Sequence, residues 1–298
     1  MGKKSDIAGI IPPLVTPFKK DGGVDLELFT RDLHYVAGCG VHGLSIGGST
    51  GEGAFLDDAE LETLVATAKK EAPAGMPIVS GIIRPSLGMA LKTAMAVKKA
   101  GADALMVTPT YYNILVPNDD GNYAFYKALS DAAKLPIIIY NVVPQNEISP
   151  KAMARLLEIP HVAGVKQSVG GVMGCYGMLL ENSGKTLVYS ATDEMIFTTF
   201  QLGVDGAISA ILSLLPKASM RMWEMAKAGD TQGGLAIQGD IFALWKVIGG
   251  PQFPARMKAV LREMGRDCGL PRSPLHETDE AFRAAVRAVL AKMDSAYS

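Results

Sequence analysis

A lysine at the end of a short apolar segment could act as a covalent catalyst. Residues 161–165 (HVAGV) have the character of a buried strand, and Lys166 follows them directly. Removal from water disfavours the charged form of an amine, and a neutral lysine amine attacks carbonyl groups to form a Schiff base. The alternative is a structural lysine whose ammonium group reaches solvent along its flexible stem.

Two further segments could complete a site around this lysine. Residues 137–141 (IIIYN) place Tyr140 near the end of the preceding strand, where it could touch Lys166 because adjacent strands lie about 4.8 Å apart. Residues 47–53 (GGSTGEG) offer backbone amides and the Ser49 and Thr50 hydroxyls to a carboxylate. The alternative for this loop is a flexible turn with glycines at positive φ. Together the three segments suggest covalent catalysis on a 2-oxo acid.

The glycine-rich loop also fits the spacing GxxxGxG of some dinucleotide-binding folds. Tyr123 and Lys127 supply a Tyr-x-x-x-Lys pair as well. That pair recurs by chance in helices, and the loop follows the second predicted strand rather than the first. The loop also lacks the Gly-Lys-Ser/Thr ending of a P-loop. We therefore favour carboxylate binding over a nicotinamide oxidoreductase.

The elements that must position these groups alternate along the chain. Strands are predicted at residues 9–16, 43–47, 77–83, 103–108, 137–142, 161–166, 186–190 and 204–209. Their nearly continuous apolar character predicts a parallel sheet that is buried on both faces. Amphipathic stretches between them include residues 57–71, 87–100, 122–133, 150–157, 193–202 and 214–228. The number and size of these units predict an α/β fold, a (β/α)8 TIM barrel.

The end of the chain departs from this alternation. Three helices and no strands are predicted there, roughly at residues 231–248, 254–267 and 278–294. We therefore expect a catalytic barrel over residues 1–230 and a C-terminal helical extension over residues 231–298. In such barrels catalytic groups gather at the carboxyl ends of the strands. Polar residues at those ends are Thr16, Ser49, Arg84, Thr108, Tyr140, Lys166, Ser190 and Ser209.

Composition argues against several other classes of protein. The formal net charge is −1 and the basic residues are spread along the chain, unlike the basic stripe of a nucleic-acid surface. The three cysteines are far apart and form no cluster with histidine, which argues against a disulfide framework and a metal site. No apolar run approaches the roughly 20 residues of a membrane span, and no signal-peptide core follows residues 1–6. We expect a cytoplasmic protein.

Five motifs occur together in one order along the chain. They are residues 12–18 (PPLVTPF), 48–52 (GSTGE), 109–112 (PTYY), 140–142 (YNV) and 164–166 (GVK). As a set they resemble the class I aldolases that include N-acetylneuraminate lyase and dihydrodipicolinate synthase, over about residues 7–295. The resemblance implies a TIM barrel with a C-terminal helical region, assembled as a homotetramer that is a dimer of dimers. It implies no cofactor beyond the lysine Schiff base.

The resemblance also implies roles for individual residues. Lys166 would form the Schiff base with C2 of pyruvate or another 2-oxo acid, and Tyr140 would act as general acid and base. Ser49 would link Tyr140 to Tyr112, which would reach in from the neighbouring subunit.

The same resemblance implies a substrate-binding set. Gly48, Ser49 and Thr50 would hold the substrate carboxylate, and the backbone around Ile208 would line the pocket.

Two departures from dihydrodipicolinate synthases bear on the substrate. Those enzymes typically carry an arginine after the fifth-strand tyrosine, whereas residues 144–147 (PQNE) include no basic residue; they also use Thr-Thr where this chain has Ser49-Thr50. The chain is therefore expected to be a pyruvate-forming aldolase that cleaves a 2-oxo-4-hydroxy sugar acid. The alternatives are a synthase that condenses pyruvate with an aldehyde, a Schiff-base dehydratase of a 2-oxo-3-deoxy sugar acid, and a non-catalytic sensor of a 2-oxo acid.

Arg84 stands after the third strand, where the family has a small, glycine-rich turn. One hypothesis is that its guanidinium binds a remote anionic group of the substrate. The alternative is a structural ion pair with an acidic residue of a loop.

Overall fold

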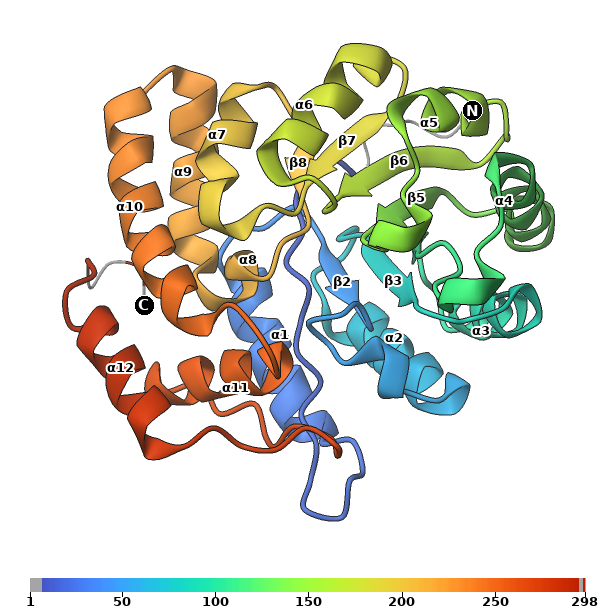
Figure 1. The fold of residues 1–298 in the computed structure, drawn as a ribbon. Coiled ribbons are helices and arrows are strands. Elements are labelled where there is room, and N and C mark those ends of the chain that lie inside the picture. Colours follow the sequence, from blue (N-terminus) through green and yellow to red (C-terminus); the bar gives the residue numbers. More distant parts are fainter. Residues whose placement is uncertain (1–6, 295–296, 298) are drawn as a thin grey trace.

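The computed structural model describes residues 7–294 and 297. Residues 1–6 of the predicted barrel region, and residues 295, 296 and 298 of the predicted extension, lie outside the described part. Within it, one parallel sheet has the order β1-β8-β7-β6-β5-β4-β3-β2 (Figure 1). The strands are β1 (Gly9–Ile10), β2 (Leu44–Ile46), β3 (Ile78–Ile82), β4 (Ala104–Val107), β5 (Ile137–Asn141), β6 (Val162–Gln167), β7 (Leu187–Ser190) and β8 (Gly206–Ala207).

Closure of the sheet confirms the predicted TIM barrel. β1 pairs with β8, and a bridge between Pro13 and Ser45 joins the segment after β1 to β2. The first predicted strand, residues 9–16, is shortened to two residues. Pro12 and Pro13 explain this difference, because a proline has no N–H to donate to a strand ladder.

Helices surround the sheet on its outside (Figure 1). Those of the barrel are α1 (Leu26–Gly38), α2 (Asp58–Glu71), α3 (Leu87–Lys99), α4 (Asp119–Ala133), α5 (Pro150–Leu156), α6 (Gly171–Asn182), α7 (Ile196–Gln201), α8 (Ile211–Leu214) and α9 (Pro216–Ala228). Short 3-10 turns follow four strands: η2 (Gly53–Phe55), η3 (Asn113–Leu115), η4 (Pro144–Asn146) and η5 (Asp193–Met195). The predicted helix at 214–228 is divided before Pro216, because a proline pushes the residue before it out of helical geometry.

The C-terminal helices are α10 (Thr231–Ile248), α11 (Phe253–Glu263) and α12 (Glu280–Leu290). They confirm the three predicted helices, although α11 ends four residues early, just before Gly265 adopts a left-handed φ of 78°. In Figure 1 they form an extension beside the barrel, and α10 packs on α9 and α12. The division into two domains at residue 230 stays a prediction.

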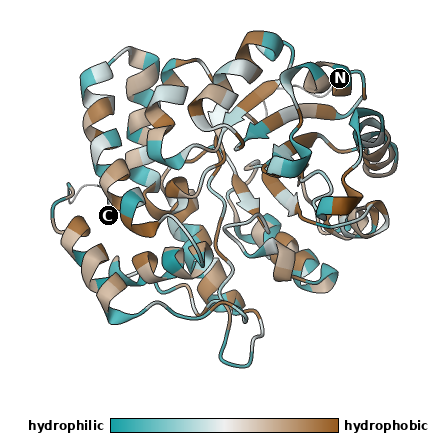
Figure 2. Cartoon of the chain, in the orientation of Figure 1, coloured by the Kyte–Doolittle hydropathy of each residue, from teal (hydrophilic) through white to brown (hydrophobic). Residues whose placement is uncertain are grey.

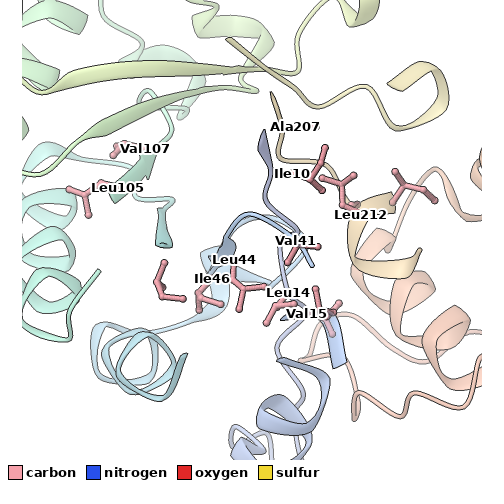
Figure 3. Close-up of a cluster of buried hydrophobic side chains, with 14 of the residues drawn as sticks. Ile10, Leu14, Val15, Val41, Leu44, Ile46, Leu105, Val107, Ala207 and Leu212 are labelled. Atoms are coloured by element: carbon pink, nitrogen blue, oxygen red, sulfur yellow. The ribbon is translucent and has the colours of Figure 1, made fainter. Parts of the chain in front are cut away.

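The interior of the barrel and its outer shell are two separate apolar clusters. Along β5, Ile138 and Tyr140 belong to the interior cluster, whereas Ile137 and Ile139 belong to the shell between sheet and helices. This alternation is the two-residue period of a strand. Figure 3 shows part of the shell, where Ile10 of β1 lies near Leu212 of α8. Figure 2 shows hydrophobic residues along the strands, with hydrophilic residues more frequent on the helices.

Two further features concern only residues 7–294 and 297. No helix among them is both long and apolar enough to cross a membrane. They also contain no group of three or more His, Cys, Asp or Glu side chains arranged to hold a metal ion.

Candidate active site

Lys166 and Tyr140 are brought together by the register of two strands. Tyr140 of β5 lies opposite Lys166 of β6 in the parallel ladder. The Lys166 Nζ lies 3.8 Å from the centroid of the Tyr140 ring, and each residue is only 4% exposed. Val165 points into the outer shell, so its neighbour Lys166 faces the barrel interior. The structure thus brings the expected lysine and phenol together in a buried position, and their catalytic roles stay a prediction.

The amine of Lys166 has no direct polar partner within the described residues. The positive charge of Lys166 acts on the carboxyl group of Asp193 in η5. The Asp193 carboxyl accepts hydrogen bonds from Ser209 Oγ at 2.5 Å and from the Ile211 amide at 2.7 Å. Burial raises its pKa to about 6, and the Lys166 charge counteracts part of this rise. Sequence reasoning missed Asp193, whose only signal was an acid placed just after the seventh strand.

The glycine-rich loop, residues 47–53, extends the site from the end of β2. Ser49 Oγ lies 3.2 Å from the Tyr140 hydroxyl, and Thr50 is buried at 5% exposure. The amides of Gly51 and Gly53 both donate to the Gly48 carbonyl at 3.0 Å. A Cβ on Gly53 would lie 1.7 Å from the Gly47 oxygen, so this fold of the loop requires glycine there.

Gly48 and Ile208 both lie against the barrel interior. A Cβ on Gly48 would approach Met106, a member of the interior cluster. Ile208 is fully buried in that same cluster with Tyr140. Its amide donates to the Ser190 carbonyl at 3.0 Å, so only its side chain and carbonyl are available to a ligand.

The guanidinium of Arg84 is occupied by hydrogen bonds within the protein. Its guanidinium donates to Thr93 Oγ1 at 2.9 Å and to the carbonyls of Gly53 at 3.0 Å and Leu56 at 2.9 Å. It also lies 3.5 Å from an Asp58 carboxylate oxygen, and the residue is 6% exposed. This geometry favours the structural ion pair over the hypothesis of a substrate-binding cation. Arg84 instead holds the segment that follows the glycine-rich loop.

Tyr112 does not join the site within this chain. It precedes η3, is 58% exposed, and makes no hydrogen bond to Ser49 among the described residues. The resemblance placed this residue in a neighbouring subunit, and its exposure is compatible with that expectation.

Comparison with known proteins places the chain in a family. The model of the dihydrodipicolinate synthetase family matches residues 6–293. A 4-hydroxy-tetrahydrodipicolinate synthase of Stenotrophomonas maltophilia (strain R551-3) is 34% identical over 277 residues, which cover 90% of this chain and 91% of that protein.

Solved structures agree with this placement. A chloride-inhibited dihydrodipicolinate synthase from Acinetobacter baumannii, complexed with pyruvate, has a TM-score of 0.89 and 32% identity, covering 96% of this chain and 98% of that chain. A dihydrodipicolinate synthase described as the first monomeric variant has a TM-score of 0.90 and 27% identity, covering 98% of each chain. The chain therefore belongs to the dihydrodipicolinate synthetase family and is a carbon–carbon lyase of the lysine Schiff-base class.

Proposed function

We propose that the protein joins pyruvate, or a related 2-oxo acid, to an aldehyde through a Schiff base on Lys166. The observation that carries this proposal is the buried amine of Lys166, which lies over the ring of Tyr140 and has no direct polar partner in the part of the chain that the structure describes. The names of the relatives, which are synthases, favour condensation. They favour it over the cleavage of a sugar acid that the sequence analysis set first.

The geometry supports a sequence of steps for this reaction. The Lys166 amine attacks the C2 carbonyl, and loss of water leaves an iminium at C2, which makes the C3 hydrogens acidic. Removal of a C3 proton then gives an enamine, whose C3 attacks the aldehyde carbon. The Tyr140 hydroxyl, hydrogen-bonded to Ser49, is placed to give a proton to the new alkoxide. Hydrolysis of the iminium releases the product and restores the amine.

The glycine-rich loop supports binding of the 2-oxo acid's carboxylate. The amides of Gly51, Glu52 and Gly53 are occupied by hydrogen bonds within the loop. No protein acceptor among the described residues occupies the amides of Ser49 and Thr50. These two amides, with their side-chain hydroxyls, form the part of the loop that suits an anion.

Cleavage of a 2-oxo-4-hydroxy acid is the second candidate, because it is the same reaction reversed. The loop after β5 favours an aldehyde half without a carboxylate at that place. Gln145 and Asn146 of η4 donate to the carbonyls of Tyr111 and Thr110, and residues 144–147 include no cation. Dehydration of a 2-oxo-3-deoxy sugar acid would use the same enamine.

We also propose a homotetramer in which Tyr112 reaches the site of a neighbouring subunit. Tyr112, Ile114 and Leu115 are exposed at 58%, 81% and 68%, an apolar group that a second copy would cover. Sedimentation equilibrium tests the assembly, and a monomer with full activity would contradict the proposal.

The catalytic proposal is tested by incubating the protein with pyruvate and borohydride and measuring its intact mass. We expect a reduced adduct in the wild type and none in Lys166→Ala. Pyruvate consumption with neutral, hydroxylated and carboxylated aldehydes then identifies the second substrate. A wild-type protein that forms no adduct would overturn the proposal and favour the sensor alternative.

A further inference from the structure

A buried ion pair joins the C-terminal helical region to the glycine-rich loop. We propose that this pair, Lys258 of α11 with Glu52, is a positioning device that sets the affinity for the 2-oxo acid without touching it. The inference rests on the proposed function of the loop as the carboxylate site. The proposal thereby adds α11, a helix outside the barrel, to the elements that support the site.

The two charges of the pair are fully partnered. Lys258 Nζ lies 2.6 Å from Glu52 Oε1 and also donates to the Leu270 carbonyl at 2.7 Å. Glu52 Oε2 accepts from the Arg272 amide at 2.9 Å. The side chains are 2% and 0% exposed, so water does not screen the attraction between them. A buried pair of this kind is held rigidly, since each displaced charge would lose its oppositely charged partner.

Glu52 connects the buried ion pair to the candidate site through its backbone. Its φ is 55°, a left-handed conformation that a residue with a side chain adopts only when surrounding contacts hold it. The Glu52 amide donates to the Ser49 carbonyl at 3.1 Å, and Ser49 Oγ lies 3.2 Å from the Tyr140 hydroxyl. A short path of direct contacts therefore runs from Lys258 to the residues expected to meet the substrate.

Two other contacts hold the backbone of the same loop but do not hold the Glu52 side chain. Thr16 Oγ1 donates to the Gly51 carbonyl at 2.7 Å, and Arg84 donates to the Gly53 carbonyl. Both hold backbone oxygens on either side of Glu52. Within the described residues, the Glu52 carboxylate is bound by groups of the C-terminal region, Lys258 and the Arg272 amide. Loss of this anchor would let residue 52 leave its strained conformation and carry Ser49 with it.

The chain offers a matched control. Arg266, also in the C-terminal region, pairs with Asp32 of α1 at 2.6 Å, with side chains 10% and 5% exposed. It donates as well to the carbonyls of Ser213 and Leu214. This second buried pair ties the same region to the barrel, and neither of its side chains forms a hydrogen bond or ion pair with residues 47–53 among the described residues. Arg266→Met thus removes comparable packing without disturbing the proposed path.

The experiment measures the pyruvate concentration that gives half-maximal borohydride trapping, using the full chain at a temperature where circular dichroism shows each variant folded. We expect Lys258→Met to raise this concentration about tenfold, a factor that corresponds to about 1.4 kcal/mol of binding free energy. Glu52→Gln, which keeps the side-chain shape, should raise it in the same direction. Trapping at saturating pyruvate should reach the wild-type level in both variants, and Arg266→Met should titrate as the wild type does.

Two results would overturn the inference. One is wild-type half-saturation in both Lys258→Met and Glu52→Gln, which would make the pair a purely structural one. The other is an equal shift in Arg266→Met, which would show that general packing of the C-terminal region is responsible. Neither result touches the proposed function, which fails separately if the wild type forms no adduct at all.

Discussion

Two lysines of this protein are almost equally buried and have opposite surroundings. Lys166 is 4% exposed and Lys258 is 2% exposed. The ammonium of Lys258 donates hydrogen bonds to the Glu52 carboxylate and to a backbone carbonyl. The amine of Lys166 has the face of the Tyr140 ring beside it and no hydrogen bond or ion pair among the described residues.

This difference shows that burial alone does not identify a nucleophile. Burial lowers the pKa of the Lys258 ammonium, although the charge and hydrogen bond of Glu52 oppose that change. In the ion pair with Glu52 this nitrogen carries its proton and has no free lone pair, and its hydrogen-bond partners lie where a substrate would have to approach. A nucleophilic lysine needs a buried amine that is not already hydrogen-bonded within the protein, so that a substrate can reach its nitrogen. Lys166 meets that condition at the end of a barrel strand, where catalytic groups of this fold lie.

The largest expected effect concerns proton transfer beside Lys166. Tyr140→Phe keeps the aromatic ring over the amine and removes only the hydroxyl. We expect kcat for the condensation to fall by about 10²–10⁴, the usual contribution of a general acid–base group. Borohydride trapping of pyruvate should persist. A variant with wild-type kcat would assign the proton transfer to another group.

The two lysines should also differ in what they contribute to stability. Lys258→Met leaves the Glu52 carboxylate buried without its cation, which costs about 3–5 kcal/mol when a buried pair is broken. Lys166→Met loses the contact of the amine with the Tyr140 ring, worth at most about 0.5–2 kcal/mol, and breaks no hydrogen bond or ion pair among the described residues, so its effect should be smaller. Guanidinium unfolding of both variants measures this. Equal losses of unfolding free energy would contradict the distinction.

Asp193 should make stability depend on pH. Burial raises its pKa to about 6, above the ordinary value of 3.8, so between these values the folded state binds more protons than the unfolded state. The free energy of unfolding that this group contributes therefore falls as the pH rises through that window. Asp193→Asn should match the wild type near pH 4 and exceed it by about 3 kcal/mol near pH 7.

Urea unfolding at several pH values follows this difference. A constant offset between Asp193→Asn and the wild type from pH 4 to pH 7 would show that the carboxyl does not titrate in that range.

The smallest expected effect is at the loop. Ser49→Ala removes one hydroxyl that contacts Tyr140 and leaves the loop backbone in place. We expect kcat/KM to fall about tenfold, since one hydrogen bond contributes roughly 0.5–1.5 kcal/mol. Steady-state kinetics with pyruvate and the best aldehyde measure this. A loss as large as that of Tyr140→Phe would make Ser49 the principal proton-transfer group.

The strand-borne half of the site could be predicted from the sequence, because period and register determine it. A two-residue alternation turns Tyr140 and Lys166 inward, and adjacent parallel strands place them opposite each other. The barrel followed from the same alternation of strands and helices. The breaks at Pro12 and Pro216 were visible as residues, but their effect on element boundaries was not anticipated.

The loop-borne half depends on contacts between distant parts of the chain. Lys258 and Glu52 are 206 positions apart, and no local pattern marks them as partners. For Arg84 the sequence left two hypotheses open, a cation for the substrate and a structural ion pair; in the structure the carbonyls of Gly53 and Leu56 occupy its guanidinium. The tightly folded glycine-rich loop leaves backbone carbonyls that need hydrogen-bond donors. Which side chain supplies those donors is visible only in the folded structure.

The most direct test of the account is to locate the trapped pyruvate on the chain. Wild-type protein is reduced with borohydride in the presence of pyruvate, digested, and sequenced by tandem mass spectrometry. The account predicts the reduced adduct on the peptide that contains Lys166 and an unmodified Lys258. An adduct on Lys258, or one spread over exposed lysines with Lys166 unmodified, would contradict the assignment of Lys166 as the nucleophile.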